Sequence, residues 1–458
     1  MAKVLLVQPN RDIRLNSEDK YAIPSTLIVV ATAIEEKHTV KIYDRNIKKG
    51  DQEFFQFLKE YDPDIIGFTA MTSAMLLDII HLGPLIKKEN EKRIIVVGGV
   101  HVTIEPDSVL NEKYVDYIIR GEGDEAFLEF CDIFDKNPKN LGKLKNVNMN
   151  ALRPLVDMNK LKFPDYSLIN LKEYGQVFLM TTRGCPGNCT FCYNAKMWGK
   201  EGHPFVRIYD TEKTKEFLKE AIEKYGITDF TIGDENFTTL KTRAIEICKF
   251  LKEKYDKKIN FFVFSRADFV NDEMLNALKM AGCSGVQFGS ESGSQRVLDF
   301  LDKHISVEVQ GKAFELCRKN RIFSDASFMV GIPTETVEEA NMTEKFIKKY
   351  KPDLADVKIF NPMPGSKIFE DLVKERIITK PKTLEEWADW SGDWSTIRHN
   401  CSKIPDDLLL KIANRLWNYR YYSTRIRKAL YWIKRGKFEN VIQKTKNLII
   451  RRYSSRTY

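Results

Sequence analysis

Residues 183–192 read RGCPGNCTFC, and this loop decides the architecture of the part of the chain around it. Cys185, Cys189 and Cys192 lie within eight residues in a C-x3-C-x2-C pattern, whereas the other five cysteines are scattered singly. The loop directly follows a predicted strand, VFLMTT, and contains two glycines and a proline. A loop can wrap thiolates around one ligand where a helix cannot, so the pattern predicts a thiolate site at the end of a strand.

Three clustered thiols favour an iron–sulfur cluster. Structural zinc sites usually have four ligands, and the nearest histidine is His203, eleven residues beyond Cys192. Iron–sulfur clusters are bound by Cys thiolates, and three thiolates leave one iron of a four-iron cluster open for a small molecule. Zinc and three unrelated buried thiols are the alternatives. We therefore predict a 4Fe-4S cluster on these cysteines.

The strand before the cysteine loop opens a run of alternating strands and helices over residues 176–370. The predicted strands are VFLMTT, DFTIGD, INFFVFS, GVQFGS, SFMVGI and DVKIFN, with helical stretches such as TEKTKEFLKEAIEKYG between them. Six β/α units are too few to close an eight-stranded barrel. We expect a partial (β/α)6 barrel with its chemistry at the carboxyl ends of the strands.

Residues 1–140 show a similar alternation. The predicted strands are KVLLVQ, HTVKIYDRN, PDIIGFTAM, RIIVVGGVHV and VDYIIRG. Nearly all-apolar strands separated by helices indicate a parallel sheet covered on both faces. The fold class is therefore α/β, with an amino-terminal doubly wound, flavodoxin-like domain whose ligand lies beyond the carboxyl ends of the strands. Residues 141–175 are polar and irregular and are predicted to be a connector.

The composition is that of a globular protein with sizeable cores. The chain has 458 residues, of which 43% are hydrophobic and 30% charged. The start, MAKVLLVQPN, has the pattern of a strand and not of a secretory signal. The most apolar early stretch, IPSTLIVVATAI, is too short for a transmembrane helix. Eight cysteines in this length do not form a disulfide framework, and we expect a cytoplasmic protein.

Positive charge is concentrated in the predicted carboxyl-terminal helical region, residues 371–458. Residues 401–458 hold 15 Lys and Arg against 3 Asp and Glu, whereas residues 1–400 hold 58 against 61. A nucleic-acid surface over the body is therefore not supported, and no nucleic-acid partner is expected. From residue 404 the pattern is a basic amphipathic helix with interfacial aromatics, which predicts peripheral contact with a membrane surface. A solvated tail and a tail docked on a partner protein are the alternatives.

Three tryptophans, Trp387, Trp390 and Trp394, lie near the expected end of the partial barrel. Two compatible interpretations exist. They could cover the open barrel mouth and exclude water, or they could pack a small helical domain onto the barrel.

The cysteine loop, with Phe191 before its last cysteine, resembles the signature of the radical S-adenosylmethionine superfamily. The resemblance implies that the open iron binds the amino and carboxylate groups of S-adenosylmethionine. Reduction by a donor such as flavodoxin or ferredoxin would then release a 5′-deoxyadenosyl radical, which takes a hydrogen atom from the substrate. The cofactors supply the difficult chemistry, and the protein positions them.

The resemblance covers roughly residues 175–370. GDENFT (233–238) stands where the family has a Gly-Glu type motif on the methionine amine, and which of Asp234 and Glu235 contacts the amine stays open. GIPTET (331–336) departs from the family pattern at Thr334. The resemblance implies the following S-adenosylmethionine contacts: Phe191, Gly233, Asp234, Glu235, Arg266 in SRAD, Glu291 and Ser292 in the ESG stretch, Gly331 in GIPTET, and Pro364 in NPMPGS.

The first domain resembles the cobalamin-binding domain that precedes the radical unit in one subclass. IGFTAMTSA, VVGGVHVT and VDYIIRGEGDEAF carry the resemblance, and adjacent glycines let backbone approach a bulky ligand. The loop QPNRDIRLN lacks the histidine that ligates cobalt in many cobalamin proteins, so we expect cobalamin without a histidine ligand. The implied cobalamin contacts are Thr69, Thr72, Ser73, Gly98, Gly99, His101, Thr103, Gly121 and Glu122, with His101 as a hydrogen-bonding wall residue.

Together these resemblances predict a cobalamin-dependent radical enzyme similar to class B methyltransferases. The expected reaction is methylation of an unactivated carbon, and the basic tail suggests a lipid or lipid-linked substrate. A radical cyclisation or carbon–carbon coupling with the same cofactors is the first alternative. A non-catalytic iron–sulfur protein that docks on membranes is the second. A methylthiotransferase is less favoured, because its first domain should offer three further cluster cysteines and residues 1–140 contain only Cys131.

Overall fold

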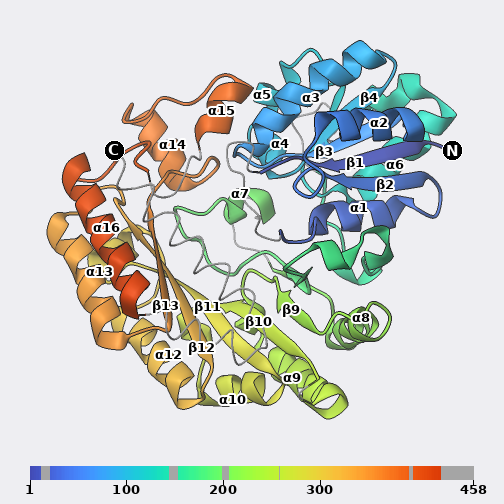
Figure 1. Cartoon of the computed structure of the whole chain (residues 1–458). Helices are drawn as coiled ribbons and strands as arrows, with labels where there is room; N and C mark the ends of the chain where they lie inside the picture. The colour runs from blue at the N-terminus through green and yellow to red at the C-terminus, as the bar shows by residue number, and fades with distance from the viewer. Residues whose placement is uncertain (12–20, 144–152, 199–205, 257, 391–395, 424–458) are drawn as a thin grey trace.

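The computed structural model describes residues 1–11, 21–143, 153–198, 206–256, 258–390 and 396–423. Two parallel sheets, each flanked by helices, form the two halves of the molecule (Figure 1). The amino-terminal half is drawn in blue to teal, and the second half runs from green to red.

The first sheet is the predicted doubly wound one. Its strand order is β2-β1-β3-β4-β5, and every pair is parallel, which is the flavodoxin-like order. The strands are β1 (Lys3–Gln8), β2 (Thr39–Asp44), β3 (Ile65–Thr69), β4 (Ile94–Gly98) and β5 (Tyr117–Ile119). Helices α2 (Asp51–Tyr61) and α3 (Met75–Glu89) share a core with one face of the sheet. Helices α1 (Ser25–Ile34) and α6 (Gly123–Lys136) share a core with the other face.

The predicted fourth strand, RIIVVGGVHV, extends four residues too far at its carboxyl end. The strand ends at Gly98, and two short helices follow, α4 (Val100–Ile104) and α5 (Pro106–Leu110). Gly99 turns the chain with a φ of +101°, and a Cβ there would lie 2.7 Å from the carbonyl oxygen of Ala70. Only glycine tolerates this turn, because an L side chain is strained at this φ and the neighbouring atom is rigid backbone.

The second sheet is the predicted partial barrel. Six parallel strands lie in chain order, β6-β9-β10-β11-β12-β13. They are β6 (Phe178–Leu179), β9 (Asp229–Ile232), β10 (Asn260–Ser265), β11 (Cys283–Glu291), β12 (Phe323–Val330) and β13 (Leu354–Ile359). The helices after these strands are α8 (Thr211–Glu223), α9 (Lys241–Tyr255), α10 (Asp272–Met280), α11 (Gln295–Phe300), α12 (Val307–Lys319) and α13 (Val337–Tyr350). Figure 1 shows α8, α9, α10, α12 and α13 along one side of this sheet, which leaves the other side concave.

The predicted first strand of the barrel, VFLMTT, is split. β6 joins the barrel, but β7 (Thr182–Arg183) pairs antiparallel with β8 (Arg207–Ile208). The split occurs because Asp234 accepts hydrogen bonds from the amides of Thr181 and Thr182, at 2.6 and 2.9 Å. The cysteine loop therefore leaves a short hairpin-like ladder and leads into α7 (Asn194–Trp198).

Two of the three tryptophans pack between the halves of the molecule. Trp387 and Trp390 lie on α15 (Leu384–Trp390), next to α3, and contact Phe369 of α14 (Lys367–Lys374). Their core contains side chains of both the first domain and the barrel, such as Leu82 and Leu301. They therefore pack the helical region against the barrel, as the second interpretation expects, and against the first domain as well. Trp394 lies outside the described residues.

The first part of the predicted amphipathic tail is docked on the barrel. In α16 (Asp406–Ser423), Leu409, Ile412 and Leu416 are buried in the core of the second half. The indole of Trp417 donates to the Val357 carbonyl of the last strand at 2.5 Å. The membrane interpretation is therefore wrong for this segment, whose apolar face and Trp417 are occupied. Residues 424–458 lie outside the described part of the chain. None of the described helices is long and apolar enough to cross a membrane.

Candidate functional site

The three predicted cluster cysteines lie on one loop between β7 and α7. Each is partly buried, and the loop curls around Gly187, where a Cβ would lie 3.6 Å from Sγ of both Cys185 and Cys189. Thr190 ties the loop to the barrel, because its amide donates to Leu301 and its carbonyl accepts from Ile368. Within the described ranges, no three His, Cys, Asp or Glu side chains are placed to hold a single metal ion.

Two cations stand beside the thiols. Burial raises the pKa of all three cysteines, to about 12 for Cys192, and the charges of Arg266 and Lys303 act in the opposite direction on Cys185 and Cys189. Thiols must lose their protons to bind a metal. A loop of three thiols with two buried cations next to it suits the thiolate ligands of a cluster.

Lys303 is a residue that the sequence did not single out. Its ammonium is buried, lies 3.0 Å from Oε1 of Glu291 and sits over the Phe191 ring at 5.8 Å. Glu291 has a φ of +63°, which directs its carboxylate over Gly289. A Cβ on Gly289 would lie 2.5 Å from that carboxylate. In the sequence Lys303 ends the stretch SQRVLDFLDK, where nothing distinguishes it from a surface lysine.

The structure separates the roles of Asp234 and Glu235. Asp234 is fully buried and accepts hydrogen bonds from Thr181 and Thr182, with the charge of Arg243 nearby. Its oxygens are therefore occupied by the protein. Burial raises the pKa of Glu235, which lies close enough to Cys185 to affect the pKa of that thiol. Oε2 of Glu235 is buried without a hydrogen-bond partner, and such an orphaned acceptor next to the cysteine loop fits the amine of a bound ligand.

The next two predicted S-adenosylmethionine contacts lie in different places, one at the cysteine loop and one inside the barrel. Arg266 lies at the loop, with NH1 3.2 Å from the place of a Cβ on Gly187, and pairs with Asp268 at 2.9 Å. Ser292 is buried and accepts the amide of Ser294, so it holds a turn inside the barrel.

Two more of these contacts lie in the barrel's later loops. Gly331 has a φ of +85°, donates to Glu335 and faces Leu409 of α16. Burial raises the pKa of Glu335 to about 7. Pro364 is buried, and the Gly365 that follows it packs near Ile104 of the first domain.

The concave side of the barrel carries an aromatic wall. Phe178 stacks on Phe264 with ring centroids 6.4 Å apart, and these rings are on the side opposite the helix-covered core. Gly233 leaves room for Phe178 and Met180, since a Cβ there would lie 2.6 Å from the Met180 sulfur. The predicted Gly233 contact is therefore also a packing requirement of this wall.

The predicted cobalamin residues gather at the carboxyl end of the first sheet. The Thr69 hydroxyl and the backbone of Gly98 and Gly99 lie together there. The Thr103 hydroxyl donates to Gly99 and accepts from the amide of Gly121. Thr72, at 2.8 Å, and Ser108 occupy the two ring nitrogens of His101.

The last two predicted cobalamin contacts also have partners within the protein. The Ser73 hydroxyl accepts the Met75 amide at the start of α3. The Glu122 carboxylate is held by two arginines, Arg183 and Arg207, from the second half of the chain.

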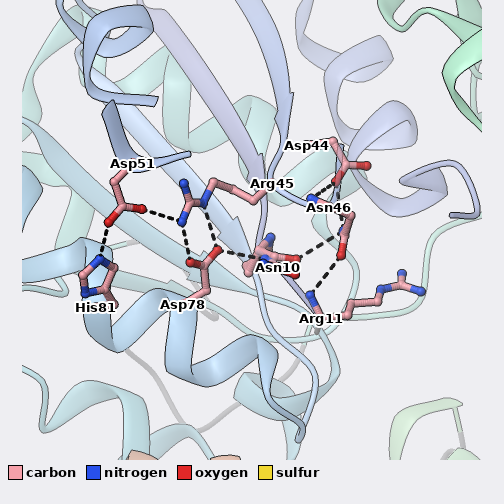
Figure 2. A network of polar contacts seen from close by, with 9 residues as sticks. Asn10, Arg11, Asp44, Arg45, Asn46, Asp51, Asp78 and His81 are labelled. Atoms are coloured by element: carbon pink, nitrogen blue, oxygen red, sulfur yellow. Dashed lines mark hydrogen bonds and ion pairs between the residues drawn. The ribbon is translucent and has the colours of Figure 1, made fainter. Parts of the chain in front are cut away.

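A polar network anchors the loop after β1. Figure 2 shows Arg45 between Asp51 and Asp78, with its NH2 2.8 and 2.9 Å from their oxygens. Asp78 of α3 also accepts the amide of Asn10 at 2.8 Å. In this strand order ligands bind near the ends of β1 and β3. The network therefore holds Asn10 and Arg11, directly beyond β1, at the edge of the sheet where the crevice is expected.

Comparisons with known proteins agree with this geometry. A family model described as B12 binding domain matches residues 19–130, and one described as Radical SAM superfamily matches residues 179–347. The chain is 33% identical over 395 residues to a protein of Pyrococcus horikoshii named uncharacterized methyltransferase PH0819, covering 82% of this chain and 84% of that protein.

Two further comparisons come from a more distant relative and a solved structure. The anaerobic magnesium-protoporphyrin IX monomethyl ester cyclase of Rubrivivax gelatinosus is 29% identical, over 68% of this chain and 58% of that protein. The methyltransferase TsrM of Kitasatospora setae, solved with cobalamin and a [4Fe-4S] cluster, has a TM-score of 0.73 over 98% of this chain and all of that one. At 15% identity this likeness concerns the fold alone.

Both halves of the chain match their family models, the cysteine loop offers three thiols beside an orphaned carboxylate, and a relative matches over most of the length. The chain therefore belongs to the cobalamin-binding radical S-adenosylmethionine enzymes, whose cofactors are a 4Fe-4S cluster, S-adenosylmethionine and cobalamin.

Proposed function

We propose that this enzyme methylates an unactivated carbon atom. The observation that carries the proposal is the junction of the two halves, where the cysteine loop, α15 and the first domain share one core around Trp387. Phe191 of the cysteine loop packs against this core. The name of the Pyrococcus relative supports methyl transfer. When bound, the cluster with S-adenosylmethionine supplies a radical that abstracts hydrogen, and cobalamin supplies the methyl group.

The chain's own residues would orient these groups. Oε2 of Glu235 would accept a hydrogen bond from the amine of the methionine moiety, because this buried oxygen near the cysteine loop has no hydrogen-bond partner in the protein. Arg266 and Lys303 would face negative charge, either a carboxylate or the thiolates. The packed core around Trp387 and Phe369 would keep water from the space between the two halves.

Labelled S-adenosylmethionine tests the reaction type. The reconstituted holoenzyme is incubated under anoxic conditions with a reductant and methyl-labelled S-adenosylmethionine. An extract of cells that naturally contain this protein supplies the substrate. We expect label in an extracted product, together with S-adenosylhomocysteine and 5′-deoxyadenosine. Extract-dependent 5′-deoxyadenosine without labelled product would instead favour the radical cyclisation named for the Rubrivivax relative. The absence of 5′-deoxyadenosine under all conditions would overturn catalysis.

We also propose that cobalt has no histidine ligand in this protein. Burial lowers the pKa of His101 to about 3, and both of its ring nitrogens lie within hydrogen-bond distance of hydroxyl groups. The ring is therefore neutral and already bonded. We expect the cobalt(II) form of bound cobalamin to show an electron paramagnetic resonance spectrum without splitting from an axial nitrogen, and His101→Gln to leave it unchanged. Splitting in the wild type that disappears in this variant would contradict the proposal.

The lipid substrate and the membrane contact rest on residues 424–458. This segment holds 11 Lys and Arg against one Glu, and each basic residue near an anionic surface contributes about 1 kcal/mol. A soluble substrate gives no reason for such a segment, so we propose a lipid or lipid-linked substrate. A reduced flavodoxin or ferredoxin would supply electrons.

Co-sedimentation with vesicles tests the membrane contact. The enzyme should bind vesicles that contain phosphatidylserine, and binding should weaken with salt because screening acts within about 10 Å at 0.1 M. Removal of residues 424–458 should abolish binding, whereas a larger deletion that includes Leu409 and Leu416 would expose the barrel core and is unsuitable. If the whole chain ignores these vesicles at low salt, the membrane contact is wrong.

A further inference from the structure

A buried charged joint connects the first domain to the cysteine loop. Arg183 stands two residues before Cys185, on β7, and its side chain is only 15% exposed. Its guanidinium donates to both oxygens of Asp124, at 2.9 and 2.8 Å, and to Oε1 of Glu122 at 2.5 Å. Both carboxylates are 5% exposed and lie at the start of α6, which belongs to the first domain.

A second arginine completes the joint. Arg207 on β8 donates to both oxygens of Glu122, at 2.8 and 2.9 Å. It also donates to the carbonyl of Val156 in the connector, and the amide of Val156 donates back to Glu122 at 2.8 Å. The first domain, the connector and the hairpin that starts the cysteine loop therefore meet at one carboxylate.

The geometry of this joint restricts how the parts can move. A guanidinium bound to both oxygens of a carboxylate is fixed in direction as well as distance. Breaking a buried pair leaves an uncompensated charge away from water, so small displacements of β7 relative to α6 are costly. Both carboxylates also lie at the amino terminus of α6, where the helix dipole attracts negative charge.

The position of the joint relates it to the two cofactors. Gly121, at the carboxyl end of the first sheet, directly precedes Glu122 at the start of α6, and its amide donates to the hydroxyl of Thr103. Gly184 and Cys185 directly follow Arg183. The joint thus links the backbone that borders the expected cobalamin crevice to the backbone that carries the first cluster ligand.

We propose that Arg183, held by Asp124 and Glu122, is a positioning residue that fixes the cysteine loop at one separation from the cobalamin of the first domain. The proposal rests on the proposed function, since it needs both cofactors in one chain. Its guanidinium donates three hydrogen bonds, all to carboxylates of the first domain, and its role is to set the distance across which radical and methyl group must meet.

The test measures the distance between the two metal centres in the holoenzyme. Pulsed electron paramagnetic resonance between cobalt(II) and the reduced cluster should give one narrow distance in the wild type. In Arg183→Gln and in Asp124→Asn, a broad distribution of distances should replace this single narrow distance. Arg183→Lys keeps the charge without the two-pronged geometry and should also broaden it. The double variant should be no broader than either single one, because both changes break the same contact.

Arg93→Gln is the matched control. Arg93 is also a buried arginine, 4% exposed, and pairs with Asp62 at 3.0 Å and with Glu89, but it precedes β4 at the opposite end of the first sheet. We expect this variant to keep the narrow distance. A narrow distance in both Arg183→Gln and Asp124→Asn would overturn the proposal, as would equal broadening in the Arg93 variant.

The same experiment separates this proposal from the proposed function. If the wild type binds no cobalamin, the proposed function fails and the joint has no cofactor to position. If the wild type binds both cofactors but methylates nothing in the extract, the distances still decide the role of Arg183. With a methylated product in hand, the Arg183 variants should form more 5′-deoxyadenosine per product molecule than the Arg93 control.

Discussion

Replacing Cys185, Cys189 and Cys192 together with alanine should abolish both iron binding and the formation of 5′-deoxyadenosine. The three thiols are the only cysteines that the chain places on a single loop, and clusters of this type are bound by Cys thiolates. The change removes every predicted protein ligand to iron, so the expected loss is complete and not graded. Iron and sulfide analysis of the anaerobically reconstituted protein measures the outcome, together with the absorbance of the thiolate-to-iron charge-transfer bands.

Cys401→Ala is the matched control for this variant. Cys401 is partly buried like the cluster cysteines but lies beside the loop of Thr334, whose amide donates to its carbonyl. This variant should bind iron like the wild type. The triple variant should still bind cobalamin, because one face of the first sheet has a core of its own with α1 and α6, to which none of the three cysteines belongs. Stoichiometric iron in the triple variant would remove the assignment of the cluster to this loop.

Most strands were predictable from the sequence because their buried residues are consecutive and apolar, as in Ile94–Gly98. Of Phe323–Val330 only the second half, SFMV, was predicted, because the first half contains Ser324 and Asp325. The cysteine loop was predictable for the same reason as the apolar strands. Its three ligands lie within one short segment, and their spacing is itself the signal.

The errors arose where distant residues decide local structure. The strand VFLMTT is interrupted because the carboxylate of Asp234, more than fifty residues away, captures two of its amides. The fourth strand of the first sheet stops at Gly98 because the backbone of Ala70 crowds Gly99. The first event leaves no mark in the residues of the strand concerned, whereas the adjacent glycines at 98 and 99 mark the second.

Charged groups at the site were the hardest to predict. Lys303 and Arg183 read as ordinary surface cations in the sequence, and only the fold buries them against Glu291 and Asp124. Trp417 suggested a membrane anchor because aromatic residues beside basic ones are typical of interfacial helices. The last strand of the barrel offers it a carbonyl acceptor instead. Amphipathic patterns identify an apolar face but not the surface that covers it.

Asp234 and Glu235 are adjacent, and we expect their replacement to affect different properties. Replacing Asp234 should lower the stability of the fold, and replacing Glu235 should weaken the binding of S-adenosylmethionine. Asp234→Asn should destabilise the fold, because the amide oxygen can still accept from Thr181 and Thr182 but the negative charge beside the buried Arg243 is lost. Breaking a buried charged network of this kind costs about 3–5 kcal/mol. Urea unfolding of the apoprotein should therefore show a clearly lower midpoint for this variant.

Glu235→Gln should leave that midpoint close to the wild type, because Oε2 of Glu235 has no partner to lose and the amide oxygen can keep the hydrogen bonds from Gly184 and Trp198. It should instead weaken the binding of S-adenosylmethionine to the reconstituted enzyme. A hydrogen bond to a charged group contributes roughly 1.5–3 kcal/mol, which corresponds to about 10- to 100-fold in affinity. Equilibrium dialysis with S-adenosylmethionine, at full cluster occupancy, measures this directly.

The two variants therefore form a crossed pair in which each serves as the control for the other. Iron content should be retained in Glu235→Gln, so that weak binding is not a consequence of a missing cluster. If Glu235→Gln binds S-adenosylmethionine as tightly as the wild type while a correctly folded Asp234→Asn does not, the amine contact belongs to Asp234. The orphaned oxygen of Glu235 would then need another partner, and the nearest cation of the cysteine loop, Arg266, would be the first to examine, since both side chains act on the Cys185 thiol.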